Sequence, residues 1–422
     1  MLFELLELVY IYGTHEFLYW PFHLILFFII ANLVRNYLAR GYRPYTDGLT
    51  RDKVKVSVVI PEYNEELDIL EKVVSSAIEN KPDEIIMVID DGRKEIELMV
   101  KKLMEEYKYY NISLVYPSKR LGKRGSLALA WMMAKGDIIV QLDSDSIMEK
   151  NTVEEIIKPF ADPKVAGVQG HPLLYQTGGR IPFLLGQIGE LARDVVCRML
   201  DGFLVVIDGK VAAYRRDFLI KVMKDFLVEK WGNSRIVLAD DRALTYLANK
   251  LGYKTVYQST AYVRSAAQPT LVKYLKQQLR WVRSGYMYLI KDIKTGLFFQ
   301  APWKYRFQEI MYLMSPVSFT VAWVQTFLAD VKVIGIAKEY IALVTGLDIP
   351  GIVISILIFI IGIGLTFEIG YRLLGVDKSE IKKLRINFLE QIYMGIIGLF
   401  LLYPVMLYAM ITYKNVTDWL TR

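Results

Sequence analysis

Apolar and polar residues alternate over short distances in the middle of the chain, from about Lys53 to Leu289. Brief runs rich in Val and Ile alternate there with segments of helical period. The pattern predicts strands at Val54–Ile60, Ile85–Ile89, Ile112–Tyr116 and Ile138–Leu142, and helices at Glu66–Glu79, Lys94–Tyr107 and Gly125–Ala134. Strands that alternate with helices form a mainly parallel sheet, which binds ligands at the carboxyl ends of its strands.

Longer apolar segments flank this region. The first, Phe17–Tyr37, has an unbroken core from His23 to Asn32 and is long enough to span a bilayer. It lacks a basic start and a small-residue cleavage site, so we expect an anchor rather than a signal peptide. Basic residues crowd its C-terminal side, which predicts that the following domain is cytoplasmic: Arg35, Arg40, Arg43, Arg51 and Lys53.

The C-terminal part begins with an amphipathic helix at Thr270–Ile290, of which one face carries Leu271, Tyr274, Leu275, Leu279 and Val282. An aromatic segment, Leu297–Leu313, is expected along the membrane interface. Three further spans are expected near Ile310–Ala329, Ile349–Leu373 and Phe388–Tyr413.

The composition fits a chain divided between soluble and membrane parts. The 422 residues are 53 % hydrophobic and 23 % charged, with a net charge of +7. Basic flanks of membrane segments account for that charge, and no basic–aromatic stripe predicts binding to nucleic acid. Cys197 is the only cysteine, and three scattered histidines make a histidine-built metal site improbable.

Acidic motifs follow the predicted strands. Asp91, at the end of Ile85–Asp90, can accept hydrogen bonds from a uracil or ribose, although Asp-Gly is also common in turns. The loop 61–65, with Pro61, Tyr63 and Glu65, forms either the opposite wall of a nucleotide site or a polar helix cap.

Asp143 and Asp145 follow Ile138–Leu142 and are suited to bind one hard cation, Mn²⁺ or Mg²⁺, although such acids also occur in solvated turns. Asp240 and Asp241 begin a predicted helix, where acids often only complement the helix dipole. Two adjacent acids also repel each other and raise one pKa, which suits a general base for a sugar hydroxyl.

Basic and aromatic residues complete the candidate chemistry. Arg280 can bind a diphosphate, and Trp281 offers a flat platform for a sugar ring; both types also anchor helices at membrane surfaces. Lys123 and Arg124 form either a phosphate clamp or a solvated helix start.

Taken in order, these motifs resemble those of the family-2 inverting glycosyltransferases of membranes, and among them the hyaluronan synthases. The likeness runs from Val58 to Arg422 through the segments Ile85–Arg93, Gly122–Arg124, Asp143–Ser146, Gly209–Arg215, Ala239–Thr245, Gln277–Trp281 and Trp419–Arg422. Gly209-Lys210 stands where hyaluronan synthases usually have Gly-Pro.

The resemblance implies an α/β GT-A domain and a role for each matched residue. Pro61, Tyr63, Glu65, Asp91, Lys123, Asp143 and Arg280 would contact the nucleotide, and Asp143 and Asp145 the metal. Asp241, with Asp240, would act as the base. Tyr214, Arg215, Gln277 and Trp281 would meet the acceptor, and Trp419, Thr421 and Arg422 would close over the nucleotide.

The expected organisation is an anchor at 1–45, a cytoplasmic catalytic domain at 53–268, interface helices at 269–306 and transmembrane or re-entrant helices at 307–422. Three simple spans after the catalytic domain would leave Trp419 on the outer side of the membrane. We therefore expect Pro404 to break Phe388–Tyr413 into a re-entrant hairpin.

The sequence favours a multi-pass enzyme of the plasma membrane that polymerises a β-linked polysaccharide, hyaluronan-like or GlcNAc-containing, from cytoplasmic UDP-sugars and secretes it through its own helices. The alternative is a non-processive transferase that acts on a lipid-phosphate acceptor. Expected partners are the UDP-sugar, the growing chain and membrane lipids.

Overall fold

The computed structural model describes residues 19–237, 239–316, 339, 342–343 and 378–415. Its contacts divide the chain into two compact units. One comprises Met1–Leu38 and Gln308–Tyr408, and the other comprises Ala39–Phe307 and Ala409–Arg422.

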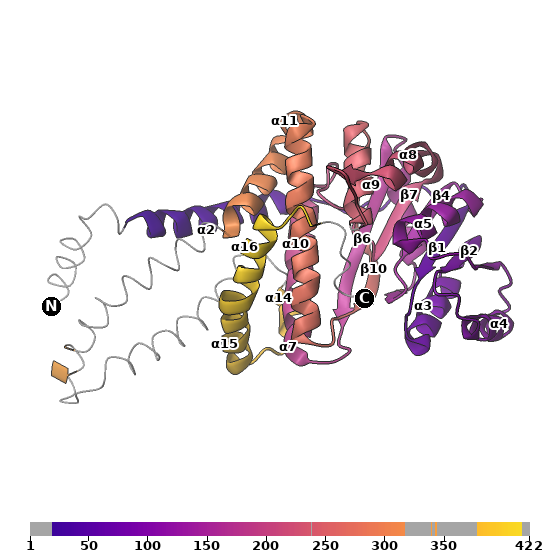
Figure 1. The fold of residues 1–422 in the computed structure, drawn as a ribbon, viewed down its shortest axis with the longest axis horizontal. Helices are drawn as coiled ribbons and strands as arrows, with labels where there is room; N and C mark the ends of the chain where they lie inside the picture. The colour runs from indigo at the N-terminus through magenta and orange to yellow at the C-terminus, as the bar shows by residue number, and fades with distance from the viewer. Residues whose placement is uncertain (1–18, 238, 317–338, 340–341, 344–377, 416–422) are drawn as a thin grey trace. The chain divides into compact units, whose positions relative to one another are not determined.

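The second unit contains an eight-stranded sheet with the order β3-β2-β1-β4-β7-β6-β10-β5 (Figure 1). Its first half is parallel, with β1 between β2 and β4 and with β3 at the edge. These strands are those predicted from the sequence, with small shifts at their ends: β1 Val56–Glu62, β2 Glu84–Ile89, β3 Ile112–Val115 and β4 Ile138–Leu142.

The second half makes the sheet mixed. β7 runs antiparallel to both β4 and β6, β10 is parallel to β6, and β5 is antiparallel to β10. These strands are β5 Ser146–Met148, β6 Val165–Tyr175, β7 Val211–Arg215 and β10 Lys254–Ala266. A separate hairpin pairs β8, Lys230–Trp231, with β9, Ser234–Arg235.

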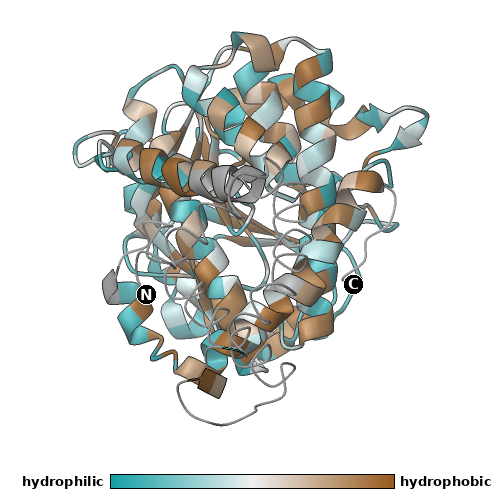
Figure 2. Ribbon diagram, turned by 90° about the vertical axis from the view of Figure 1, so that its left-hand side faces the viewer, coloured by the Kyte–Doolittle hydropathy of each residue, from teal (hydrophilic) through white to brown (hydrophobic). Residues whose placement is uncertain are grey.

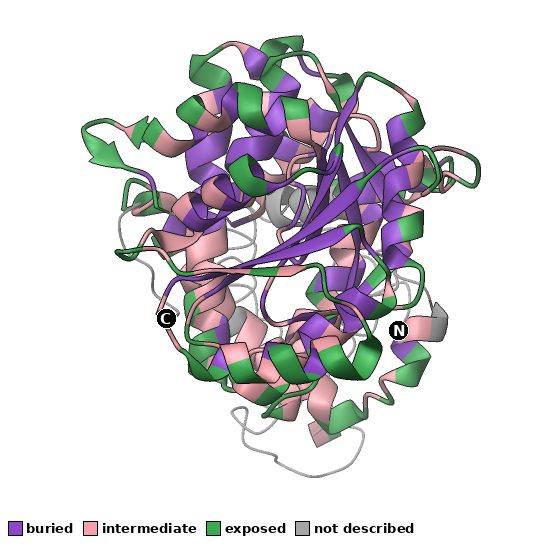
Figure 3. Cartoon of the chain, turned by 90° about the vertical axis from the view of Figure 1, so that its right-hand side faces the viewer, coloured by how far each residue is buried: buried purple, intermediate pink, exposed green. Residues whose placement is uncertain are grey.

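Helices cover both faces of the sheet, as the buried strands between exposed helices show (Figure 3). Alternate strand residues such as Val58 and Ile60 pack in one core with α3 Leu67–Glu79, α4 Glu95–Tyr107 and α6 Thr152–Ile157. The opposite face carries α5 Gly122–Met133, α8 Arg216–Val228 and α9 Asp240–Lys250. Trp131 and Phe226 pack against each other there, with ring centroids 5.0 Å apart.

Two long helices complete this unit, α7 Arg180–Met199 and α10 Leu271–Lys294, followed by α11 Leu297–Gln300 and helical residues 303–307. Polar and apolar segments alternate along the helices of the chain (Figure 2). Thr270 caps α10 by accepting a hydrogen bond from the Lys273 amide, which confirms the predicted start of the helix. Tyr274 and Val282, on the predicted apolar face, are buried.

The first unit contains α2 Tyr19–Ala39, a helix over most of the expected N-terminal anchor, whose span of the membrane stays a prediction, and the short helix α14 Lys378–Lys383. The expected break at Pro404 is wrong. α15 Phe388–Ile397, a π-helical turn η3 Gly398–Leu402 and α16 Tyr403–Ile411 form one continuous helix. The π turn immediately precedes Pro404, where it accommodates the ring and the missing N–H without ending the helix.

Among the described residues, Phe388–Ile411 is the one helix that is both long and apolar enough to cross a bilayer. The expected spans at 349–373 and over most of 310–329 lie outside the described residues.

Candidate active site

Two acidic motifs that are far apart in sequence meet around one lysine. Lys123 is the second residue of α5, Asp143 directly follows β4, and Asp240 is the first residue of α9. The ammonium of Lys123 lies 2.7 Å from Asp143 Oδ1 and 3.1 Å from Asp240 Oδ2. The Asp240 side chain is 7 % exposed, whereas that of Asp143 is 28 % exposed. The centre is therefore buried on the Asp240 side and open on the Asp143 side.

The charges of this centre shift its pKa values in opposite directions. Burial raises the pKa of Asp143; Lys123 opposes this effect, but Asp145 and Asp240 reinforce it. Burial also raises the pKa of Asp240, but Lys123 and Arg124 outweigh it and hold that pKa below its usual range. Burial and the charge of Asp240 raise the pKa of Asp241. The acid pair is thus split into one stabilised carboxylate and one more basic carboxylate.

The loop after β4 is tied to the neighbouring loop after β1. The Ser144 hydroxyl donates to Glu65 at 3.1 Å. Asp145 accepts hydrogen bonds from the hydroxyls of Ser146 and Ser265, at 3.2 and 3.3 Å. Glu65 and Asp145, predicted as nucleotide and metal contacts, therefore lie on adjacent loops at the carboxyl edge of the sheet.

Asp91 is fixed in place at the same edge. Its carboxylate accepts from the Asn64 amide at 2.7 Å and from Arg93 Nε at 2.7 Å. Burial raises the pKa of Asp91, but these hydrogen bonds and the Arg93 charge outweigh it, and the pKa lies below its usual value. Arg93 also pairs with the buried Glu62. Asp91 therefore stays ionised and able to accept hydrogen bonds.

The other residues of the loop 61–65 line the same region. Pro61 is buried within β1, and Tyr63 is half-buried, with the Arg120 guanidinium 3.9 Å from the centre of its ring. Sequence reasoning missed Asp90, whose carboxylate accepts from the amides of Leu121 and Gly122 at 2.7 and 2.8 Å. The two consecutive aspartates at 90 and 91 were the available signal for this cap of α5.

A charged quartet surrounds Trp281. Arg193 and Lys210 lie 5.4 and 4.9 Å from the centre of the indole ring. Lys210 pairs with Glu190 at 3.2 Å and with Asp208 at 2.9 Å, and Arg193 binds both carboxylates. In the sequence, Lys210 stands out only as a departure from the usual Gly-Pro, and no motif marks Glu190, Arg193 or Asp208.

Gly209 connects this quartet to the lysine centre. A Cβ atom there would lie 3.1 Å from Lys123 Nζ and 3.6 Å from both Asp143 carboxylate oxygens. A side chain at this position would therefore fill the space between the loop 208–210 and the centre and would require Lys123 to shift by a few tenths of an ångström. Gln277 and Arg280 are half-buried on α10, the helix that carries Trp281; their contact with substrate stays a prediction.

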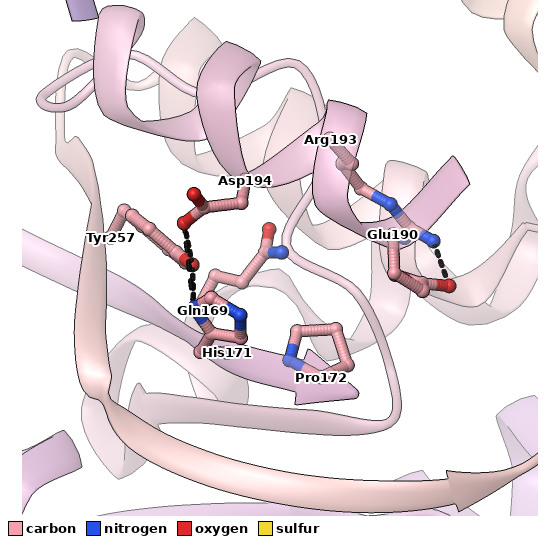
Figure 4. Close-up of a pocket in the computed structure, with 7 residues that line it drawn as sticks. All are labelled: Gln169, His171, Pro172, Glu190, Arg193, Asp194 and Tyr257. Atoms are coloured by element: carbon pink, nitrogen blue, oxygen red, sulfur yellow. Dashed lines mark hydrogen bonds and ion pairs between the residues drawn. The ribbon is translucent and has the colours of Figure 1, made fainter. Parts of the chain in front are cut away.

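A small pocket opens beside the quartet, between α7, β6 and β10 (Figure 4). Its lining residues are Gln169, His171, Pro172, Glu190, Arg193, Asp194 and Tyr257. The Tyr257 hydroxyl lies 2.7 Å from His171 Nδ1 and donates to Asp194 at 2.6 Å. These polar groups are bonded to one another, so the pocket braces α7 against the sheet.

Of the two predicted acceptor residues on β7, only Arg215 is directed away from the site; burial and the nearby charges of Asp241 and Asp240 raise the pKa of Tyr214, and its contact with an acceptor stays a prediction. Tyr214 is fully buried and stacks on Phe218. Arg215 donates to the carbonyls of Phe160, Asp162 and Val165. The register of β7 explains this correction: Val211 pairs with Leu142, next to the site, whereas Arg215 pairs with Ile138 at the opposite end of β4. The predicted gating residues Trp419, Thr421 and Arg422 lie outside the described residues.

The site fits a hard divalent cation. Asp143 and Asp145 supply carboxylate oxygens one residue apart. Burial raises the pKa of Asp143, the charges of Asp145 and Asp240 add to this effect, and a bound cation would offset both causes. Within the described residues, no group of three or more His, Cys, Asp or Glu side chains is arranged around a metal position. Phosphate oxygens and water would therefore have to complete the shell.

Comparisons with known proteins agree with this geometry. The family model described as glycosyltransferase like family 2 matches residues 54–284. A hyaluronan synthase of Streptococcus pyogenes serotype M1 is 29 % identical over 98 % of this chain and 93 % of its own length. An N-acetylglucosaminyltransferase of Rhizobium meliloti (strain 1021) is 28 % identical over 56 % of this chain and 57 % of its own length.

Among solved structures, a mannosyltransferase from Pyrobaculum calidifontis in complex with GDP-Man and Mn²⁺ has the same fold, with a TM-score of 0.58 at 17 % identity. The match covers 90 % of this chain and 98 % of the mannosyltransferase. The predicted α/β GT-A domain and the predicted likeness to hyaluronan synthases are confirmed. The chain therefore belongs to glycosyltransferase family 2 and is an inverting UDP-sugar glycosyltransferase.

Proposed function

We propose that this enzyme polymerises a β-linked polysaccharide, hyaluronan-like or GlcNAc-containing, from cytoplasmic UDP-sugars and secretes it through its own membrane helices. The observation that carries the proposal is the Lys123 centre. The ammonium of Lys123 lies between the carboxylate of Asp143, directly after β4, and that of Asp240, at the start of α9. Asp241, the more basic carboxylate, follows Asp240 in the chain. This arrangement suits a leaving diphosphate on one side and an acceptor hydroxyl on the other.

In the proposed reaction, Asp241 removes the proton from the acceptor hydroxyl, whose oxygen attacks the anomeric carbon of the sugar. The bond to the UDP oxygen breaks on the opposite face, so one inversion converts an α-linked donor into a β-linkage. Asp91 and the loop 61–65 hold the nucleotide, and Lys123 stabilises the negative charge of the departing diphosphate. Asp143 and Asp145 would hold Mn²⁺ or Mg²⁺, which would neutralise further charge on that diphosphate.

Polymerisation rather than single addition is supported by the relatives. The hyaluronan synthases match along nearly the whole chain, including its membrane-like segments. Trp281 lies on α10 within reach of the loop 208–210, which approaches the centre. An aromatic platform there would hold the end of a growing chain. A membrane setting with bound lipids is supported by the apolar helix Phe388–Ile411 and by these relatives.

The test is product sizing with the purified full-length chain in lipid nanodiscs, supplied with radiolabelled UDP-GlcNAc, UDP-GlcA and UDP-Glc, singly and in pairs. Long polymer that requires Mn²⁺ or Mg²⁺ is the expected product. Asp145→Asn should abolish incorporation, whereas Asp162→Asn, in a surface pair with Lys254, should not. Single-sugar products on a lipid phosphate would replace this proposal with the non-processive alternative. Full incorporation in excess chelator would refute the metal assignment.

A further inference from the structure

Arg124, the neighbour of Lys123 on α5, lies in a buried network that the proposed reaction does not use. Its guanidinium donates to the carbonyl of Phe226 at 2.8 Å and to Glu229 Oε2 at 2.8 Å. A third hydrogen bond, of 3.3 Å, reaches the carbonyl of Ala239. The side chains of Arg124 and Glu229 are 5 % and 8 % exposed, so this ion pair is removed from water.

The Ala239 carbonyl lies directly before the Asp240–Asp241 pair in the chain. Ala239 is the N-cap of α9 and has a φ of +55°, a left-handed conformation that is uncommon for a residue with a Cβ atom. Its carbonyl also accepts the first hydrogen bond of the helix, from Ala243 at 3.0 Å. Asp240 and Asp241 come next, so the position of this carbonyl fixes where both carboxylates begin.

Glu229 connects the same network to α10, which is called the acceptor helix below because it carries Trp281. The Tyr288 hydroxyl donates to Glu229 Oε2 at 2.7 Å, and Lys291 pairs with Oε1. Both residues lie on α10, the helix that carries Trp281. One carboxylate therefore joins α5, which bears Lys123, to α10, while Arg124 extends the connection to the start of α9.

We propose that Arg124 and Glu229 are positioning residues that hold the Asp240–Asp241 pair at a fixed distance from Lys123 and from the acceptor helix. The inference rests on the proposed function in taking Asp241 as the base. Arg124 acts through the backbone of Ala239 and through its charge, which lowers the pKa of Asp240, and Glu229 acts through Arg124 and α10. Misplacing a reacting group by about 1 Å can cost roughly 100-fold in rate.

The test compares Glu229→Gln, Arg124→Met and the double variant with the wild type in three measurements. These are kcat for sugar transfer, the Kd of UDP in the presence of Mn²⁺ by calorimetry, and the melting temperature. The matched control is Arg216→Met, which removes an arginine–carbonyl bond of 2.7 Å to Ala134, at the other end of α5. We expect each single variant to lower kcat about 10- to 100-fold with the Kd of UDP unchanged, and the control to keep both values.

The double variant should lose no more activity than the worse single variant, because the two residues act as a unit. If Glu229→Gln fails to fold, Arg124→Met decides, because Glu229 keeps its ion pair with Lys291 in that variant. Wild-type kcat in folded variants would overturn the proposal, as would a parallel loss of UDP affinity. Full activity of Asp241→Asn would instead refute the assignment of Asp241 as the base, whatever the kcat of Glu229→Gln.

Discussion

Lys123→Met tests the electrostatic account of the site most directly. Lys123 lies 2.7 Å from Asp143 and 3.1 Å from Asp240, which corresponds to about 6 and about 5 kcal/mol of attraction at an effective dielectric constant of about 20. Desolvation of the three groups offsets most of this attraction. Removing one partner from a buried pair typically costs about 3–5 kcal/mol. The Lys123 side chain is 25 % exposed, so we take the lower value, about 3 kcal/mol.

For a domain of this size, about 3 kcal/mol lowers the melting temperature by roughly 6–12 °C. The effect should depend on pH. Lys123 holds the pKa of Asp240 in the folded protein below its usual range. The stability that results is fully present above the unfolded pKa of about 3.9 and is lost as the pH falls through the lower folded pKa. The difference between wild type and variant should therefore be full at pH 7 and should narrow only as the pH falls below about 3.9.

The assay is a fluorescence melt of both proteins from pH 8 down to about pH 2, with transfer measured at pH 7. Transfer by Lys123→Met should fall about 100-fold or more, because the cation facing the leaving group is lost. Lys254→Met is the control: its pair with Asp162 is exposed on both sides, and such pairs contribute about 0–1 kcal/mol. A Lys123→Met protein that melts within about 2 °C of wild type at every pH would refute the reasoning.

Two further predictions concern neighbouring charges. Burial and the charge of Asp240 raise the pKa of Asp241, so the acid limb of the pH profile of kcat/KM should have a pKa above that of an ordinary aspartate. Asp240→Asn should move this limb to lower pH. A limb that does not move in this variant would contradict Asp241 as the base. Lys210→Met should destabilise the enzyme by about 3 kcal/mol and raise the acceptor KM, because Glu190 and Asp208 lose a shared cation beside Trp281. Wild-type melting and acceptor KM for Lys210→Met would show that the quartet does not support Trp281.

The sequence determined the first half of the sheet and the positions of its acids. The hydrophobic effect stabilises Val56–Glu62 and Ile138–Leu142 as buried strands, because burial removes their apolar side chains from water. Each strand ends where polar residues begin. Asp91, Asp143 and Asp145 follow such ends, so their place at one edge of a parallel sheet follows from local pattern alone.

Only the tertiary structure decided which of these residues meet. The pairing register of β7 directs Arg215 away from the site and brings Gly209 against Lys123, because antiparallel pairing fixes both ends of a strand at once. The quartet around Trp281 and the link from Arg124 through Glu229 to α10 join segments distant in sequence. A helical period predicts that a residue is buried, but the partner of a buried charge depends on which elements pack together, and that is settled only when the sheet and its helices assemble.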